Sequence, residues 1–293
     1  MWIASKKVHY RQMRRIVILI LLLGVTLAYA QERYRQRGGR GRSSERGAAP
    51  PQGVEDATWE NDPKFQKDVF TFVRLRYTDG AGWGRWRGGR WDTDYPDSDK
   101  NFSYRLQQLT SLKVNPEPIF LDITDERLFD YPWVYMIEPG ALLFSDEEVV
   151  ILRRYLLNGG FMMVDDFWGE REWDNFYEQI KRVFPDREPK ELDIDHPIFN
   201  CVFPLKSKPQ IPSIHHWYAY QGTGITWERP DAETPHYKGI VDDKDRLMVV
   251  ICHNTDLGDG WEREGDNIEY FREMSEPKAY PLGINIVFWA MTH

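Results

Sequence analysis

The stretch LRRYLLNGGFMMVDDFWG, residues 152–169, decides the fold. Residues 152–160 are the second half of a segment, 145–160, that is predicted to be a helix. This segment has a capping box at its start and an Asn-Gly-Gly turn at its end, which are signals of a helix. The apolar run that follows predicts a buried strand over 161–167. Asp165 and Asp166 stand at the end of that strand, and a second helical segment begins after them.

The same alternation of strand and helix signals extends in both directions along the chain. Further strands are predicted at 68–77, 117–124 and 133–139, further helices at 99–113, 170–184 and 281–292, and less regular segments at 190–199 and 236–254. Strands separated by helices of this length indicate a mainly parallel sheet with helices on both faces. We therefore expect one three-layer α/β domain over 54–293, in which the aspartates lie at the carboxyl edge of the sheet, where ligands bind.

The chain begins with a segment typical of export. Residues 1–30 carry five basic side chains, an apolar run at 16–27 and the small-residue sequence AYA at 28–30, which predicts a signal peptide cleaved before Gln31 or an uncleaved signal anchor. Residues 31–53 are rich in Arg, Gly and Pro and are expected to form a disordered tether that can touch an anionic envelope surface. The predicted location is extracytoplasmic, either periplasmic or anchored to the inner membrane.

The charge of the predicted domain argues against nucleic acid as a partner. The whole chain has a net charge of −8; setting aside five positive charges in 1–30 and a net four in 31–53 leaves −17 for residues 54–293. A domain this acidic repels phosphate backbones. The two cysteines, Cys201 and Cys252, are too few for a disulfide framework, and whether they pair is left open.

Five separated motifs, DTDYPDSDKNF, LFDYPWVYM, LRRYLLNGGFMMVDDFWG, DHPIF and GINIVFWAMTH, resemble the bacterial family described as domain of unknown function 4159. The resemblance covers nearly all of 68–293. It implies a flavodoxin-like α/β fold similar to that of class I glutamine amidotransferases and ThuA-like proteins, without implying an activity. The nucleophilic cysteine of the amidotransferases has no counterpart here, because no glycine-flanked turn surrounds Cys201 and Cys252 lies within a strand. His253 is its neighbour and should face the other side of the sheet.

The loop 77–99 holds the main candidates for ligand binding. It combines glycines with tryptophans, arginines and aspartates, which suit a carbohydrate or another small polar ligand; the candidates are Trp83, Arg85, Trp86, Trp91, Asp94, Asp97 and Asp99. The alternative is a self-packed Ω-loop that covers the end of the sheet. Asp92, Asp94, Asp97 and Asp99 do not have the ligand spacing of an EF-hand, so neither a metal nor a cofactor is predicted, although an irregular hard-cation site is an open alternative.

Asp166 and Asp165 are the candidates for catalytic carboxylates, with Asp166 expected to face the loop 83–99 and Asp165 to turn away as a cap or ion-pair partner. A purely structural alternative pairs them with Arg74 and Arg76 of the first strand. The adjacent His215 and His216 lack the spacing of a metal site.

Two functions follow as expectations. The first is a ligand-binding or scaffold domain at the cell envelope, built on an amidotransferase-like fold without the nucleophile. The second is a hydrolase-like enzyme that acts on carbohydrate or cell-wall substrates through carboxylates at the edge of the sheet. A convergent pair of nucleophile and base would favour the second, and the sequence shows none.

Overall fold

The computed structural model describes residues 59–65, 68–79 and 90–293. All of them belong to one compact unit, Pro50–His293. The predicted signal segment, the tether and the loop residues Trp83, Arg85 and Trp86 lie outside the described ranges. Among the helices of the described part, none is both long and apolar enough to span a bilayer.

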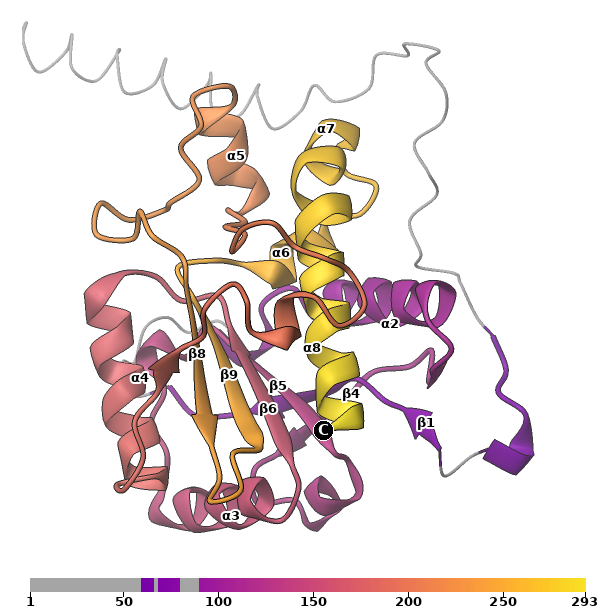
Figure 1. Ribbon diagram of the computed structural model, residues 1–293, viewed down its shortest axis with the longest axis vertical. Coiled ribbons are helices and arrows are strands. Elements are labelled where there is room, and N and C mark those ends of the chain that lie inside the picture. The colour runs from indigo at the N-terminus through magenta and orange to yellow at the C-terminus, as the bar shows by residue number, and fades with distance from the viewer. Residues whose placement is uncertain (1–58, 66–67, 80–89) are drawn as a thin grey trace, which may run out of the picture. The chain divides into compact units, whose positions relative to one another are not determined.

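A seven-stranded sheet forms the centre of the domain (Figure 1). In spatial order its strands are β4 (Ile119–Asp122), β2 (Val73–Arg76), β5 (Trp133–Ile137), β6 (Phe161–Asp165), β9 (Leu247–His253), β8 (His236–Val241) and β7 (Lys190–Glu191). The five strands from β4 to β9 run parallel, whereas β8 is antiparallel to both of its neighbours. The prediction of an α/β domain with a mainly parallel sheet is therefore confirmed.

The order of the parallel strands reverses direction once. Along the chain β2 comes first; β4 is added on one side of it, and β5, β6 and β9 follow on the other. In sheets of this kind a crevice opens beyond the carboxyl ends of the strands at such a reversal, because the connections leave toward opposite faces. The reversal lies between β2 and β5.

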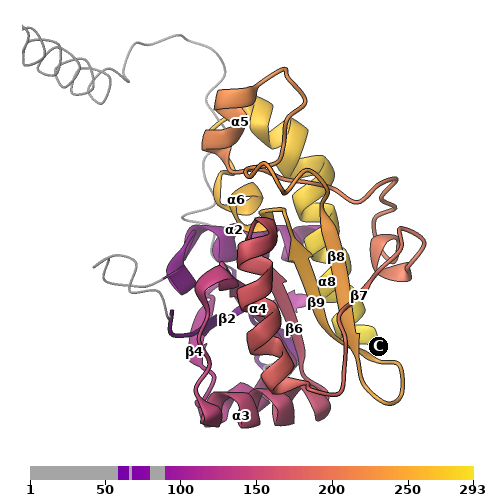
Figure 2. The same ribbon diagram turned by 90° about the vertical axis from the view of Figure 1, so that its left-hand side faces the viewer.

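Helices pack on both faces of the sheet because the central strands are apolar on both sides. The α-helices are α2 (Asp97–Leu109), α3 (Asp146–Leu157), α4 (Gly169–Val183), α5 (Ile214–Tyr220), α6 (Leu257–Glu262), α7 (Ile268–Tyr270) and α8 (Tyr280–Thr292), with a π-helix at Phe271–Ala279. Residues of α2, α6 and α8 share one buried cluster with the sheet, and those of α3 and α4 share the other. Figures 1 and 2 show α4 and α8 on opposite sides of the strands.

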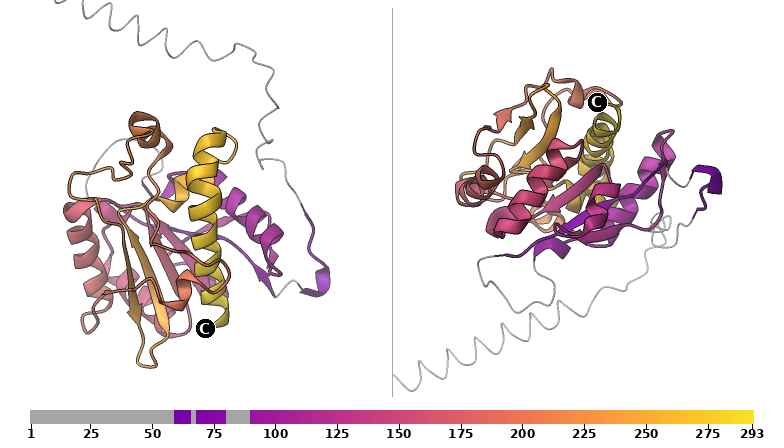
Figure 3. Two further views of the ribbon diagram at one scale, coloured as in Figure 1. Left: turned by 45° about the horizontal axis from the view of Figure 1, so that its top comes forward. Right: turned by 90° about the horizontal axis from the view of Figure 1, so that it is seen from below.

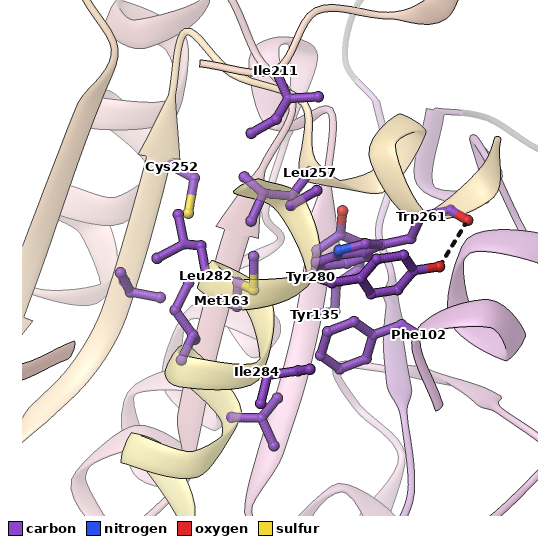
Figure 4. Packing of buried hydrophobic residues seen from close by; sticks show 14 of the residues in the cluster. Phe102, Tyr135, Met163, Ile211, Cys252, Leu257, Trp261, Tyr280, Leu282 and Ile284 are labelled. Carbon is purple, nitrogen blue, oxygen red and sulfur yellow. Dashed lines mark hydrogen bonds between the residues drawn. The ribbon is translucent and has the colours of Figure 1, made fainter. Parts of the chain in front are cut away.

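The face covered by α8 has an aromatic core (Figure 4). Phe102 of α2 lies 4.5 Å from Trp261 of α6 between ring centroids, and Tyr135 of β5 lies 5.8 Å from the same indole. Tyr280 of α8 donates a hydrogen bond of 3.5 Å to the Trp261 carbonyl. The helix α8 thus packs against the sheet through this cluster; it is the yellow C-terminal helix in Figure 3.

Several sequence predictions are confirmed in detail. Ser145 caps α3, and its reciprocal bonds with Glu148 form the expected capping box. Two predictions need correction. The segment 68–77 is not one strand, because β1 (Val69–Phe70) pairs with β3 (Lys113–Val114) in a separate small sheet before β2 begins. The segment 236–254 is the antiparallel hairpin of β8 and β9.

Candidate functional site

The two aspartates at the end of β6 diverge, as the alternation of side chains along a strand predicts. Asp165 faces the α6 side and is fully buried. Its Oδ2 accepts hydrogen bonds from the Tyr135 hydroxyl at 2.9 Å and from the backbone amides of Leu257 at 2.9 Å and Gly258 at 3.1 Å. Asp165 therefore fastens the start of α6 to the sheet.

Asp166 faces a pocket of about 230 Å³ beyond the carboxyl ends of the strands. The pocket is lined by Arg90, Thr93, Asp94, Glu138, Asp166, Trp168, Glu172, Ser213, Glu228, Arg229, Asp256 and Asp259. These residues follow β2, β5, β6 and β9 or belong to the connection between α5 and β8, except Ser213, which is the N-cap of α5. The pocket thus lies at the edge of the sheet where the strand order reverses.

The lining is strongly acidic. Of the described residues that line it, seven carry carboxylates and two are arginines. Arg90 lies 3.5 Å from Glu138 and 3.7 Å from Glu172, and Arg229 lies 3.8 Å from the same Glu172. Both guanidinium groups are therefore directed at Glu138 and Glu172, which leaves the deeper aspartates without an arginine from the lining.

Burial and mutual repulsion perturb these deeper carboxyls. Burial raises the pKa of Asp166 well above its ordinary value, and the nearby charges of Glu138 and Asp94 raise it further. Burial likewise raises the pKa of Asp256, with the charges of Asp166 and Asp259 adding to it. Several carboxyl groups converge here and cannot all ionise without a cation or hydrogen-bond donors to compensate them.

The backbone is unusual at the same place. Asp94, Glu138 and Asp166 have φ angles of 61°, 45° and 56°, in the left-handed region that L-residues rarely occupy. Such conformations cost free energy and cluster at functional sites, where the surrounding structure holds them. Three strained residues with carboxylate side chains around one pocket mark it as the candidate functional site.

The structure places the other predicted site residues differently. Asp94 lines the pocket, and Asp97 lies in the first turn of α2 outside the lining. Trp91 packs against Phe120 at 5.0 Å between ring centroids and beneath the Arg76 guanidinium, again outside the lining. Asp99 is fully buried in an ion pair with Arg74, so it is not available to a ligand.

The proposed pairing of the β2 arginines with Asp165 and Asp166 is wrong. Arg74 binds Asp99 through two nitrogens, and it also donates to Ser98 Oγ and to the carbonyls of Trp91 and Thr93. Arg76 pairs with Asp122 on the adjacent strand β4. The arginines are consumed by side chains and carbonyls nearer to them, which leaves Asp166 to the pocket.

The cysteines and histidines lie away from this chemistry. Both cysteines are free; Cys252 is buried in β9, and Cys201 donates to the Asn285 carbonyl at 3.3 Å. Burial raises the pKa of both thiols, which disfavours a nucleophilic thiolate. His216 stacks on Tyr220 with 4.5 Å between ring centroids.

Most of the lining was not foreseen from the sequence. Five carboxylates reach the pocket from separate segments: Glu138, Glu172, Glu228, Asp256 and Asp259. Only the acidic run 254–264, directly after the predicted strand, is a local signal of such a site in the sequence. Asp94 and Asp259 also form a closer group with Glu262: each offers one carboxylate oxygen, and these atoms all lie within 4.8 Å of one another. Burial, with the charge of Asp259 adding to it against the opposing effect of Arg263, raises the pKa of Glu262 to about 7.

Comparison with known proteins identifies the family but assigns no chemistry. A search of the curated proteins finds no match. The family model described as "Domain of unknown function (DUF4159)" matches residues 71–291, which include every strand of the central sheet and the whole described lining of the pocket. The chain therefore belongs to the family of domain of unknown function DUF4159.

Proposed function

We propose that this chain is a ligand-binding domain of the cell envelope and that its ligand occupies the acidic pocket. The single observation that carries the proposal is the convergence of buried carboxyl groups that have no arginine partner within 59–65, 68–79 and 90–293, above all Asp166 and Asp256. A buried carboxylate without an opposite charge is costly even where it accepts one hydrogen bond, as Asp166 does from the Trp168 indole and Asp256 from the Asp259 amide. A ligand that supplies hydrogen-bond donors or positive charge at the carboxyl edge of the sheet would offset that cost.

The lining favours a small polar ligand rich in hydroxyl groups, such as a carbohydrate. Carboxylates accept hydrogen bonds from hydroxyls, and Arg90 and Arg229 offer donors at the same pocket. Trp168 contributes an aromatic side chain, and its indole Nε1 donates to Asp166 Oδ1 at 3.0 Å, which orients that carboxyl. A volume of about 230 Å³ lies below the roughly 300–1,000 Å³ of pockets for drug-sized ligands, which favours a small molecule such as one sugar unit.

We further propose that the domain is a three-layer, flavodoxin-like relative of the class I glutamine amidotransferases and ThuA-like proteins. The support is the order of the parallel strands, which in chain order reads 2-1-3-4-5, the flavodoxin-like arrangement. No cysteine belongs to the pocket lining of the described residues, so glutaminase chemistry is not part of the proposal.

The envelope location rests on the sequence of residues 1–30. Cell fractionation and N-terminal sequencing of the natural protein test it: an extracytoplasmic protein that begins near Gln31, or a full-length chain in the membrane fraction, is expected. Full-length protein confined to the cytosol would refute it.

Ligand binding is tested by screening the full chain against an array of mono- and disaccharides and measuring each hit by calorimetry. Asp166→Asn should weaken binding at least about tenfold, because one oxygen that can accept a hydrogen bond from the ligand is replaced by an NH₂ group and a buried ligand hydroxyl is left unpaired. Asp92→Asn is the matched control, since Asp92 lies close by in sequence but outside the lining. A saccharide that binds wild type and Asp166→Asn equally would place the ligand elsewhere.

A second candidate function is hydrolysis of a carbohydrate or cell-wall substrate. It is favoured by one observation: Glu262, with its pKa raised to about 7, lies beside the carboxyl of Asp94. A carboxyl group that titrates near neutral pH is suited to general acid–base work. Turnover of any saccharide hit, abolished in Glu262→Gln but retained in Asp92→Asn, would favour the enzyme over the binding domain.

A further inference from the structure

The group formed by Asp94, Asp259 and Glu262 has the geometry of a cation site. One oxygen of each carboxylate lies within 4.8 Å of the other two. Oxygens that ligate one Ca²⁺ at about 2.3–2.6 Å are separated by up to about 5 Å when they stand on opposite sides of the ion. The three oxygens can therefore reach one ion without rearrangement of the backbone.

Asp94 supplies an independent sign that a ligand is needed. Its Oδ2 is buried and accepts no hydrogen bond from any described residue. The atom lies against the start of α6, where a Cβ at Gly258 would come within 2.8 Å of it. In its ionised form, a carboxylate removed from water requires a hydrogen-bond donor or a cation.

In the part of the chain that the structure describes, the positive charges near the three carboxylates are too few to neutralise them. Arg263 contacts Asp259 at 3.2 Å and Glu262 at 2.7 Å, and it also contacts Asp266, so one guanidinium serves three carboxylates. Arg74 is committed to Asp99 and makes no ion pair with Asp94. The Asp94 carboxylate has no ion-pair partner among the described residues.

We propose that Asp94, Asp259 and Glu262 bind one divalent hard cation of the Ca²⁺ type. The donors are all carboxylate oxygens, which suit Ca²⁺, Mg²⁺ or Mn²⁺ rather than Zn²⁺ or copper. Asp259 and Asp94 also line the acidic pocket, so the ion lies at its wall. Three protein ligands leave coordination positions for water or for hydroxyl groups of the ligand, and in this respect the inference deepens the proposed function and rests on it.

The test is a calorimetric titration of the full chain, freed of metal with EDTA and gel filtration, with CaCl₂, MgCl₂ and MnCl₂. One ion per chain is expected, with a dissociation constant below about 1 mM, the weak end of the range for extracellular calcium modules. Addition of the ion should raise the melting temperature of the protein.

Two variants and a control make the test specific. Asp94→Asn should weaken ion binding at least about tenfold, as loss of a ligand or its support does, and in EDTA it should melt no lower than wild type because a repelled charge is gone. Glu262→Gln removes another carboxylate of the group and should weaken ion binding similarly. Asp92→Asn should bind within about twofold of wild type, because Asp92 belongs neither to the group nor to the pocket lining.

Absence of binding of all three ions at about 1 mM, or equal affinity in wild type, Asp94→Asn and Glu262→Gln, would overturn the inference. Saccharide titrations in EDTA and in Ca²⁺ separate it from the proposed function. Saccharide binding without any ion binding would refute the cation site and leave the binding domain standing. Ion binding without any saccharide hit would support the cation site and count against a carbohydrate ligand.

Discussion

Replacing Asp99 by Asn should destabilise the domain more than any other conservative change at a charged residue of β2 or its partners. The side chains of Arg74 and Asp99 have no solvent exposure, and Arg74 Nε donates to Asp99 Oδ2 at 3.1 Å. Burial lowers the pKa of Arg74, but the Asp99 charge and hydrogen bonds outweigh it, so the net shift is upward and the guanidinium stays charged. Asp99→Asn leaves that charge buried and uncompensated, which costs about 3–5 kcal/mol.

Urea denaturation and thermal melts of the full chain measure this cost. In a domain of this size about 1 kcal/mol shifts the melting temperature by about 2–4 °C, so a decrease of about 6–20 °C is expected. The control is Asp122→Asn, which breaks the neighbouring Arg76–Asp122 pair. Those side chains are 43% and 46% exposed, and exposed pairs contribute at most about 1 kcal/mol. A loss below about 1 kcal/mol for Asp99→Asn would refute the argument that Arg74 depends on its partner.

The remaining predictions concern the pocket, the pH dependence and the thiols. Asp166→Asn should leave the melting temperature at pH 7.5 unchanged or raise it, because burial raises the pKa of Asp166 and disfavours its charge. A large decrease in a thermal melt would show that the carboxylate is needed for stability. In EDTA the free energy of unfolding should be greatest near pH 5 and fall toward pH 8. The reason is that Asp165 and Glu262 have pKa values of about 7 in the folded protein, above their values in the unfolded chain. The stability that these two groups add at low pH is therefore lost as the pH rises through 7. Glu262→Gln should reduce this pH-dependent loss of stability, measured by urea titrations at several pH values. An unchanged dependence of the free energy of unfolding on pH would contradict the raised pKa of Glu262. Cys201→Ser combined with Cys252→Ala should retain ligand binding by calorimetry with only a packing loss in the melt, whereas lost binding in a folded variant would implicate a thiol.

The long elements could be predicted from the sequence because local signals agree with the tertiary structure. The helix α3 has its capping box, α4 ends at Val183 before Pro185, and β6 is a continuous apolar run. The helix α6 was missed, because Gly258 and Gly260 lower its helix propensity. Those glycines are required by close approach: a Cβ at Gly260 would stand 2.6 Å from the Ala279 Cβ.

The candidate site could be predicted only in part for a related reason. The position of Asp166 followed from the rule that ligands bind at the carboxyl edge of a parallel sheet. The partners of Arg74 could not be predicted from the sequence. They depend on the way residues 90–99 fold back over β2, which no hydrophobic periodicity indicates. The carboxylates from α6 and from the connection before β8 were missed because their proximity is a property of the folded chain.

The two edges of the sheet have a consequence for how the protein behaves at high concentration. An edge strand with free backbone groups can recruit a strand from another molecule and start aggregation. Here one edge is β7, only Lys190–Glu191, and the other is β4, only Ile119–Asp122. Both residues of β7 are exposed and charged, and Glu191 is held by Lys208 and His236. A strand from another molecule would gain few hydrogen bonds at either edge. The sheet therefore resists extension by strands of other molecules and needs no covering subunit for this.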